Sequence, residues 1–405
     1  MNRKQFGILI VLLIVLGGAG WLVQQGRDRA AGAGEQGTGQ KLVGESFPIN
    51  DVARITIKQG TNELNLVKKN DLWRVSERYD YPANYSAISG FLLKLRDLKV
   101  IQSEAVGASQ LPRLQLAPLG QGTNSGVMVD FKNKDDKSIK TLTLGKKHLR
   151  KGQPPAQQFQ MGEESMAYGR YILVAGNTQN ALLIAEPLNN IEPKAGEWLS
   201  KDFFKVERPK AIAVTFPAAT NSWKIVRDTD SGDWKLADAK GDEKLDQARA
   251  SSVSSPFASP SFNDVLSPNT KPQDNGLDKP IVVTIDTFDD FTYTVKVGSK
   301  SDQDYPVTMT VLANFPKERI PAKDEKPEDK DKADKAWQTR QQQLEEKIKQ
   351  SKRFENWTYL VPSWNVDPIL KERKDLLVEK KEEVKPGDKA EEPKADLKVE
   401  SIPAN

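Results

Sequence analysis

The stretch Arg54-Ile-Thr-Ile-Lys58 alternates apolar and polar side chains, and similar runs follow at 63–67 and 72–75. Alternation with a period of two predicts strands of an antiparallel sheet that buries one face. This block decides the fold because a second copy of it begins at Ala211. The folded part of the chain is therefore predicted to consist of two related halves.

A long and degenerate repeat extends from this block through most of the chain. Ile212 follows Ile55 by 157 residues, and Trp234 follows Trp73 by 161 residues. The later strand-like runs also form matching pairs: 126–145 with 281–298, 171–174 with 307–311, and 181–184 with 357–361. Each copy is predicted to close with a short helix, at about 188–203 and about 367–377.

A helix is predicted within each copy, between its first and second groups of strands. Asn84 is a suitable N-cap ahead of 85–98, whose apolar residues recur at helical spacing. The residues on that face are Ile88, Phe91, Leu92, Leu95 and Leu98. The second copy has a weaker helix candidate at 245–253. The predicted fold class is α+β, with two tandem modules of mostly antiparallel sheet and helices on one face.

An uncharged apolar run at 6–23 precedes the repeat. Its length predicts one transmembrane helix, which would place the protein in the inner (cytoplasmic) membrane with the bulk of the chain in the periplasm. A cleaved signal peptide is the alternative, although the small-residue site at 31–33 lies well past the apolar core. The chain contains no cysteine, which excludes a lipoprotein anchor and suits an oxidising compartment.

The domain organisation follows from these patterns and from shifts in composition. The expected segments are an anchor at 1–25, a glycine-rich tether at 26–45, a first module at 46–205, a second module at 206–378 with a charged helical insertion at 316–355, and a disordered charged tail at 379–405. Within the insertion, 323–335 is expected to be disordered and 335–354 helical. The helical part has a thin apolar seam of Trp337, Leu344 and Ile348, which fits either a solvated helix or a helix that docks a partner.

The charge balance bounds the possible partners. The chain has 60 basic and 56 acidic residues, for a net charge of +4. Such a near-balance argues against a dedicated nucleic-acid binder. The basic cluster at 146–151 has two interpretations, a solvated surface or a contact with lipid head groups or an anionic wall polymer.

No motif in the sequence indicates a catalytic, cofactor-binding or metal-binding residue. His148 is the only histidine and is expected in a solvated loop, so a histidine-based triad or zinc site has no support. The acidic run at 228–233 lacks the glycine and glutamate of a calcium loop. The glycines at 120–122 lack a phosphate-loop lysine. The pairs Asp135-Asp136 and Asp289-Asp290 are expected in hairpin turns.

Aromatic residues near the end of the second copy have two interpretations. Trp357, Tyr359 and Trp364 could form a platform for a sugar, or they could pack in the core. Core packing is favoured because Trp357 and Tyr359 precede the apolar pair Leu360-Val361 in one strand-like run. No cofactor is expected.

The chain resembles the bacterial domain of unknown function 4340 family. The residues that carry the resemblance are Trp73, Ala83-Asn84, Gly145-Lys-Lys147, Tyr171, Gly176 and Trp198-Leu-Ser-Lys-Asp202. The resemblance covers 50–205 well and 209–378 more loosely, where 370–375 is matched to the Trp198 element. It implies an amino-terminal membrane segment and, for some members, an accessory role beside gliding-motility-type ABC transporters. It implies no site residues.

Three functions remain open on the sequence. The favoured one is a non-enzymatic, membrane-anchored extracytoplasmic accessory or scaffold protein with a membrane-protein partner. An ABC-type export or motility system is one setting for such a protein. The second is an extracytoplasmic module that binds a glycan or peptide in the cleft between the modules. The third is a hydrolase that uses unrecognised carboxylates, which would require two converging acids in a deep pocket.

Overall fold

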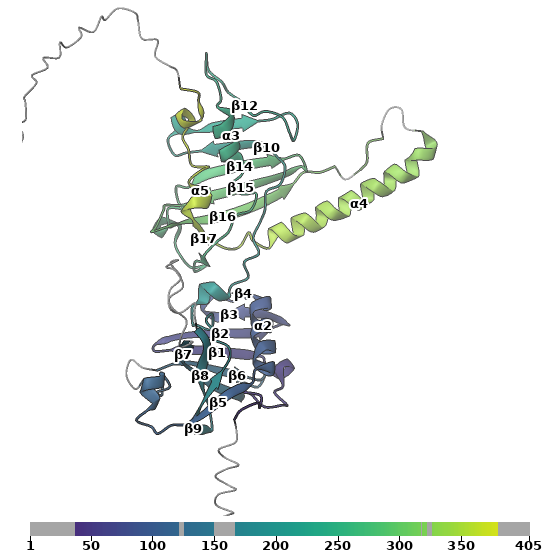
Figure 1. Ribbon diagram of the computed structural model, residues 1–405. Helices are drawn as coiled ribbons and strands as arrows, with labels where there is room; N and C mark the ends of the chain where they lie inside the picture. The colour runs from purple at the N-terminus through teal and green to yellow at the C-terminus, as the bar shows by residue number, and fades with distance from the viewer. Residues whose placement is uncertain (1–36, 121–124, 150–166, 317, 322–325, 380–405) are drawn as a thin grey trace, which may run out of the picture.

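The computed structural model describes residues 37–120, 125–149, 167–316, 318–321 and 326–379. These residues form two antiparallel sheets that follow one another along the chain, with helices packed beside them (Figure 1). The α+β class predicted from the sequence is therefore confirmed. The predicted anchor at 1–25 lies outside the described residues. Within the described ranges, no helix combines the length and apolar character needed to cross a membrane.

The first sheet has nine strands in the order β4-β3-β2-β1-β6-β7-β8-β9-β5. Their bounds are β1 (Arg54–Gln59), β2 (Asn62–Lys69), β3 (Leu72–Val75), β4 (Tyr81–Pro82), β5 (Val100–Ala105), β6 (Val127–Lys132), β7 (Ser138–Leu149), β8 (Ala167–Val174) and β9 (Asn177–Ile184). Helix α2 (Tyr85–Asp97) buries Ile88, Phe91, Leu92 and Leu95, as its spacing predicts. Asn84 is its N-cap and accepts the amide of Ala87 at 3.0 Å.

The second sheet has eight strands in the order β12-β11-β10-β14-β15-β16-β17-β13. Their bounds are β10 (Pro209–Thr215), β11 (Trp223–Val226), β12 (Lys235–Leu236), β13 (Asp264–Val265), β14 (Ile281–Thr287), β15 (Phe291–Val297), β16 (Asp304–Ala313) and β17 (Tyr359–Pro362). Helix α3 (Gln247–Ser254) begins after its N-cap Asp246, which accepts the amides of Ala248 and Arg249.

The two sheets have the same strand order, apart from the extra edge strand β4 in the first. Their registers also match, because Ile55 faces Phe131 as Ile212 faces Ile285. The predicted internal repeat is therefore confirmed at the level of topology. Each sheet buries the inward side chains of its alternating strands, which is the physical basis of the period of two.

The prediction of a helix at the close of each copy is wrong. The closing segments instead contain only short pieces, η5 (Ala195–Trp198) in the first and α5 (Ser363–Val366) and η8 (Arg373–Leu376) in the second. Pro193 interrupts the first segment, and Pro368 stands at the start of the second. The remaining short 3₁₀ turns are η1 (Ile49–Asp51), η2 (Ser76–Arg78), η3 (Leu111–Leu114), η6 (Ala219–Asn221) and η7 (Pro272–Asp274).

Each closing segment instead pairs with the residues just ahead of the helix. Leu199 bridges to Ala83, and Leu377 bridges to Leu245. The amide of Asn84 donates to the carbonyl of Trp198 at 2.7 Å, as the amide of Asp246 donates to that of Leu376 at 2.9 Å. The counterpart of Trp198-Leu199 is therefore Leu376-Leu377, which corrects the match to 370–375 made from the sequence.

Helix α4 (Pro327–Lys352) lies in the insertion between β16 and β17 and projects away from the second sheet as an arm (Figure 1). It starts well before residue 335, so the expectation of disorder is wrong for its first turns; residues 323–325 lie outside the described residues. Proline at the first helical position and a run of good helix formers explain the early start. Of the predicted seam, Leu344 is buried, and Ile348 packs against the core.

Candidate functional site

The two sheets meet at a junction of aromatic side chains that come from distant parts of the chain. Tyr81 of β4 places its ring 4.8 Å from Trp357, 5.8 Å from Phe262 and 6.2 Å from Tyr359. Tyr359 is fully buried, and the ring of Phe203 lies tilted against it with the ring centroids 4.6 Å apart. Burial raises the pKa of Tyr81 to about 12, so the phenol is neutral at physiological pH. The modules are thus joined through an aromatic cluster.

An ion pair and a lysine reinforce this junction at its edge. Arg78 donates two hydrogen bonds to the carboxylate of Asp264, from Nε at 2.6 Å and from Nη2 at 2.7 Å. Lys201 donates to the backbone carbonyl of Asn263 at 2.8 Å and lies over the ring of Phe262. Burial lowers the pKa of Lys201, which the nearby charge of Asp264 partly offsets. Both contacts fix the short edge strand β13 against the first module.

A groove of about 650 Å³ opens beside the junction, between 201–207 and the end of α4. The charged groups that line it are Lys201, Lys205, Lys347, Arg353, Asp202 and Glu207. Lys347 pairs with Glu207 at 2.7 Å, and Arg353 approaches Asp202 to 3.4 Å. The groove is therefore a salt-bridged surface and holds no pair of converging acids.

The base of the α4 arm is fastened to the second sheet by one carboxylate. Asp289 lies in the turn between β14 and β15 and is almost fully buried. Arg208 and Arg340 each donate to its Oδ1 at 2.7 Å. Lys347 donates to its Oδ2 at 3.3 Å. Burial would raise the pKa of Asp289, but the hydrogen bonds from Arg340 and Lys347 outweigh it, so the pKa is lowered.

A second groove, which we call the α2 groove, lies between α2 and the closing segment of the first module and has a volume of about 850 Å³. Its helix side is open because it carries Ser86, Ala87 and Gly90. Its other side carries Glu186, Asn189 and Glu197. The groove is thus rich in oxygen acceptors, and Lys94, which pairs with Glu186 at 3.2 Å, is its only cationic lining residue among those described.

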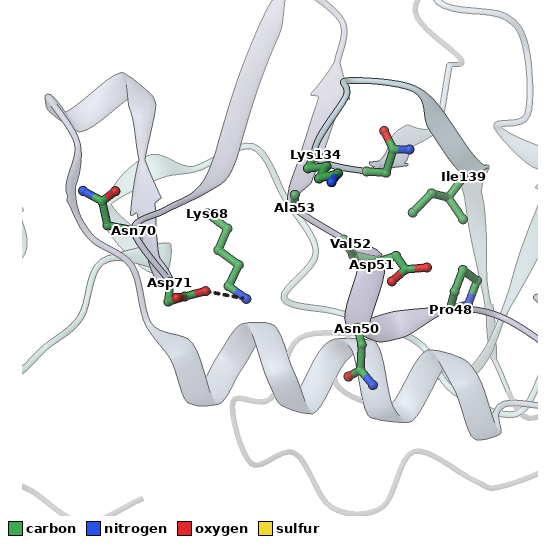
Figure 2. Close-up of a pocket in the computed structure, with 11 residues that line it drawn as sticks. Pro48, Asn50, Asp51, Val52, Ala53, Lys68, Asn70, Asp71, Lys134 and Ile139 are labelled. Atoms are coloured by element: carbon green, nitrogen blue, oxygen red, sulfur yellow. Dashed lines mark ion pairs between the residues drawn. The ribbon is translucent and has the colours of Figure 1, made fainter.

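A third hollow, of about 730 Å³, lies at the end of the first sheet between η1 and two hairpin turns. Figure 2 shows Asn70 and Asp71 on one side, Lys134 on another and Asn50 below. Lys68 and Asp71 form an ion pair at 3.3 Å within it. The two carboxylates that line the hollow, Asp51 and Asp71, lie apart in Figure 2, so it does not hold the converging acids that a carboxylate-based hydrolase would need.

His148 and the basic cluster at 146–151, which the sequence analysis considered as candidate functional residues, lie mostly in strand β7. His148 lies within strand β7 and not in a loop, which corrects that prediction. Its ring sits between those of Tyr168 and Tyr171, at 5.1 and 5.6 Å. The strand runs on because β8 pairs with it as far as Leu149, opposite Ala167. Lys146 and Lys147 of the basic cluster lie in the same strand, whereas residues 150 and 151 lie outside the described residues.

The acidic pairs and the calcium-like run form turns, as predicted. Asp135-Asp136 connects β6 to β7, and Asp289-Asp290 connects β14 to β15. The run at 228–233 connects β11 to β12. In the part of the chain that the structure describes, no three His, Cys, Asp or Glu side chains gather as metal ligands. The glycine pair at 120–122 extends outside the described residues.

The aromatic residues of the second copy do not form one platform. Tyr359 is buried and Trp357 packs against the junction, which confirms the core interpretation for both. Trp364 alone is exposed, at 65% of its surface.

Comparison with known proteins places the chain in a family. The family model for the Domain of unknown function (DUF4340) matches residues 73–280, about half of the chain. The chain belongs to this family. The DUF4340 match begins in β3 and ends just before β14. It includes the α2 groove and the junction residues Tyr81, Phe203 and Phe262, whereas Trp357 and Tyr359 lie outside it. No curated protein matches the chain. No solved structure matches it either.

Two features of this DUF4340 chain were not found from the sequence. The role of Asp289 depends on three cations that come from distant positions, so no local pattern marks it. The α2 groove had a readable signal, because alignment of the N-caps Asn84 and Asp246 places small Ala87 opposite long Arg249. The difference between Ala87 and Arg249 matters because the closing segment of each module packs beside its helix, where Arg249 can reach it and Ala87 cannot.

Proposed function

We propose that the protein is a non-enzymatic scaffold or accessory subunit, anchored in the inner membrane by 1–25, that binds a membrane-protein partner through the α4 arm. The observation that carries the proposal is the geometry of the arm. One end of α4 is held by Asp289 and by Leu344, while the rest projects from the second sheet as a polar helix (Figure 1). A stiff helix held at one end is suited to reach a partner.

The sequence supports the same proposal. The apolar run at 6–23 would tether the modules at the periplasmic face of the membrane. The family resemblance points to an ABC-type export or motility system as the setting. The joined modules would then act as a spacer that carries the arm at a set distance from the bilayer.

Site-directed photo-crosslinking tests the proposal on the full chain in native membranes. A crosslinker at Gln338, an exposed position on the arm, is expected to give a discrete adduct with a membrane protein. The same crosslinker at Lys296, an exposed position on β15, is the control and is expected to give none. Absence of an adduct at Gln338, or equal adducts at both positions, would contradict the proposal. Release of the whole protein without detergent would contradict the anchor.

A second candidate function is binding of a glycan or an anionic peptide in the junction groove. The observation that favours it is the groove itself, where Lys205 forms no ion pair with any described residue and Lys201 is partly desolvated. An array of glycans and peptides probed with residues 41–405 tests this candidate. Binding that is lost in Lys205→Glu, but kept in the exposed control Lys224→Glu, would support it.

A further inference from the structure

The α2 groove is open at a place where the helix would tolerate larger residues. Gly90 lies inside α2 with an ordinary helical backbone, and a Cβ added there would meet nothing within 4 Å. Glycine in a helix interior is less stable than alanine by roughly 0.5–1 kcal/mol, so the fold gains nothing from it. Ala87, one turn earlier, likewise leaves the groove empty. These two residues place no long side chain in the groove, whose helix wall also carries Ser86, Phe91 and Lys94.

The second module fills the equivalent space with its own arginine. Arg249 is the third residue after the N-cap Asp246, as Ala87 is the third after Asn84. Arg249 Nη1 donates to the carbonyls of Asp375 and Leu377 at 3.0 and 3.1 Å. A guanidinium thus closes the second module by capping carbonyls of the closing segment.

The first module presents the same acceptors without the arginine. Because Leu199 matches Leu377, the corresponding carbonyls belong to Glu197, which lines the α2 groove, and to Leu199, which is buried beside it. The methyl side chain of Ala87 cannot donate a hydrogen bond to these carbonyls.

A buried acceptor also lies in this groove. Asn189 Oδ1 is buried and has no hydrogen-bond partner among the described residues. Its counterpart, Asp367, lies ten residues before Leu377 as Asn189 lies ten before Leu199, and it accepts the hydroxyl of Tyr305 at 2.7 Å. The side-chain acceptor at this position is therefore unpaired in the described part of the first module, whereas in the second module Tyr305 donates a hydrogen bond to it.

We infer that the α2 groove binds an arginine side chain that a protein partner inserts. This inference rests on the proposed scaffold function and names the chemistry of the partner. The guanidinium carries five donors in a planar fork. Arg249 shows that one of its terminal nitrogens, Nη1, can donate to two carbonyls of such a closing segment. The carboxylates of Glu186 and Glu197 line the groove and pair with Lys94 at 3.2 Å and Lys194 at 3.7 Å, so an inserted guanidinium would compete with these lysines. The methylenes of the inserted side chain would lie over Ala87 and Gly90.

The test uses the full chain in detergent micelles and the tripeptide acetyl-Gly-Arg-Gly-amide. Saturation-transfer NMR detects weak binding of a small peptide to a large particle. The arginine peptide is expected to bind about tenfold more tightly than its citrulline twin, because charge-assisted hydrogen bonds are roughly twice as strong as neutral ones. The lysine twin is expected to fall between them, since an ammonium lacks the fork.

Two variants give the matched comparison. Ala87→Arg copies the second module and is expected to plug the groove, with a loss of peptide binding of about tenfold or more. Leu93→Arg adds the same charge on an exposed part of the same helix, outside the groove, and is expected to leave binding unchanged.

Equal binding of the arginine and citrulline peptides, no binding at all, or equal losses in the two variants would overturn the inference. An arm adduct at Gln338 without peptide binding would overturn the groove assignment alone. Peptide binding without an arm adduct would contradict the role of the arm and leave the groove as a ligand site.

Discussion

The two modules have one strand order but differ in how they complete it. In the first, β8 and β9 are joined by a tight turn, whereas the matching strands β16 and β17 are separated by the insertion that holds α4. In the second, Arg249 seals the space between helix and closing segment, whereas Ala87 leaves it open. The sheet is thus the shared element, and the differences lie in a loop and a groove at its borders.

Comparing the two modules distinguishes the features that the fold requires in both copies from the features that occur in only one copy. The pairing of the closing segment with the residues ahead of the helix occurs in both copies with the same hydrogen bonds. A feature found twice is explained by the architecture. A feature found once, such as the arm or the open groove, needs another explanation, and interaction with a partner supplies one.

The largest expected effect comes from breaking the contact between the modules. Tyr359→Ala would remove a fully buried ring at the centre of the junction, and we expect a loss of about 3–5 kcal/mol in the free energy of unfolding, because it leaves a cavity. Chemical denaturation followed by tryptophan fluorescence measures it. Trp364→Ala, at an exposed ring in the same region, is the control and should change little. Similar values for both would mean that the junction is not a packed core.

The next effect concerns the arm, which only the second module carries. Asp289→Asn removes the charge that holds Arg208, Arg340 and Lys347, and we expect about 2 kcal/mol less stability at the base of α4. Hydrogen exchange of α4 amides reports it as faster exchange. Asp290→Asn in the same turn is a matched control, because asparagine tolerates its positive φ. Unchanged exchange in Asp289→Asn would show that Leu344 alone fixes the arm.

The same carboxylate predicts a pH dependence with a defined sign. The pKa of Asp289 is lowered in the folded state, so its stabilisation is complete above the ordinary aspartate pKa of about 3.9 and is lost as pH falls through the lower folded value. Exchange of α4 amides, corrected for intrinsic rates, should therefore rise below about pH 4 in the wild type and not in Asp289→Asn. Parallel pH profiles for the two proteins would refute this assignment.

A smaller effect should separate the two closing segments. Arg249→Ala removes the donor to the carbonyls of Asp375 and Leu377, and we expect a loss of about 1–2 kcal/mol. Thermal unfolding measures this loss. Arg113→Ala, at an exposed arginine in η3 of the first module, serves as the control and should stay within about 0.5 kcal/mol of wild type. A neutral Arg249→Ala would remove the structural precedent for the groove.

The smallest expected effect is a gain in stability. Gly90→Ala should stabilise the protein by about 0.5–1 kcal/mol, because alanine is the better helix former and space is available. Gly145→Ala is the opposite case, because its Cβ would clash with the carbonyl oxygen of Leu114 and destabilise the protein. Differential scanning calorimetry distinguishes the two signs. A destabilising Gly90→Ala would show that the fold needs this glycine. Gly90 would then no longer support a ligand-binding role for the α2 groove.

Local patterns in the sequence were sufficient for the strands, for α2 with its N-cap Asn84, and for the hairpin turns. Each depends on neighbours a few residues apart, and burial of one face imposes a period that can be read directly. They were insufficient for the closing segments, where proline and pairing with Ala83 and Leu245 override helix propensity. They also misplaced His148, because β8 extends the pairing of β7 beyond the apolar run.

The sequence by itself determined that the chain has two α+β copies, an apolar amino-terminal run and no recognisable catalytic motif. Only the tertiary structure decided how the copies meet, where Asp289 gathers its cations, and which module leaves its groove open. The physical reason is distance along the chain. Arg78 and Asp264, or Asp289 and Arg340, are far apart in sequence, and their pairing exists only after the strands have assembled and brought them within hydrogen-bonding range.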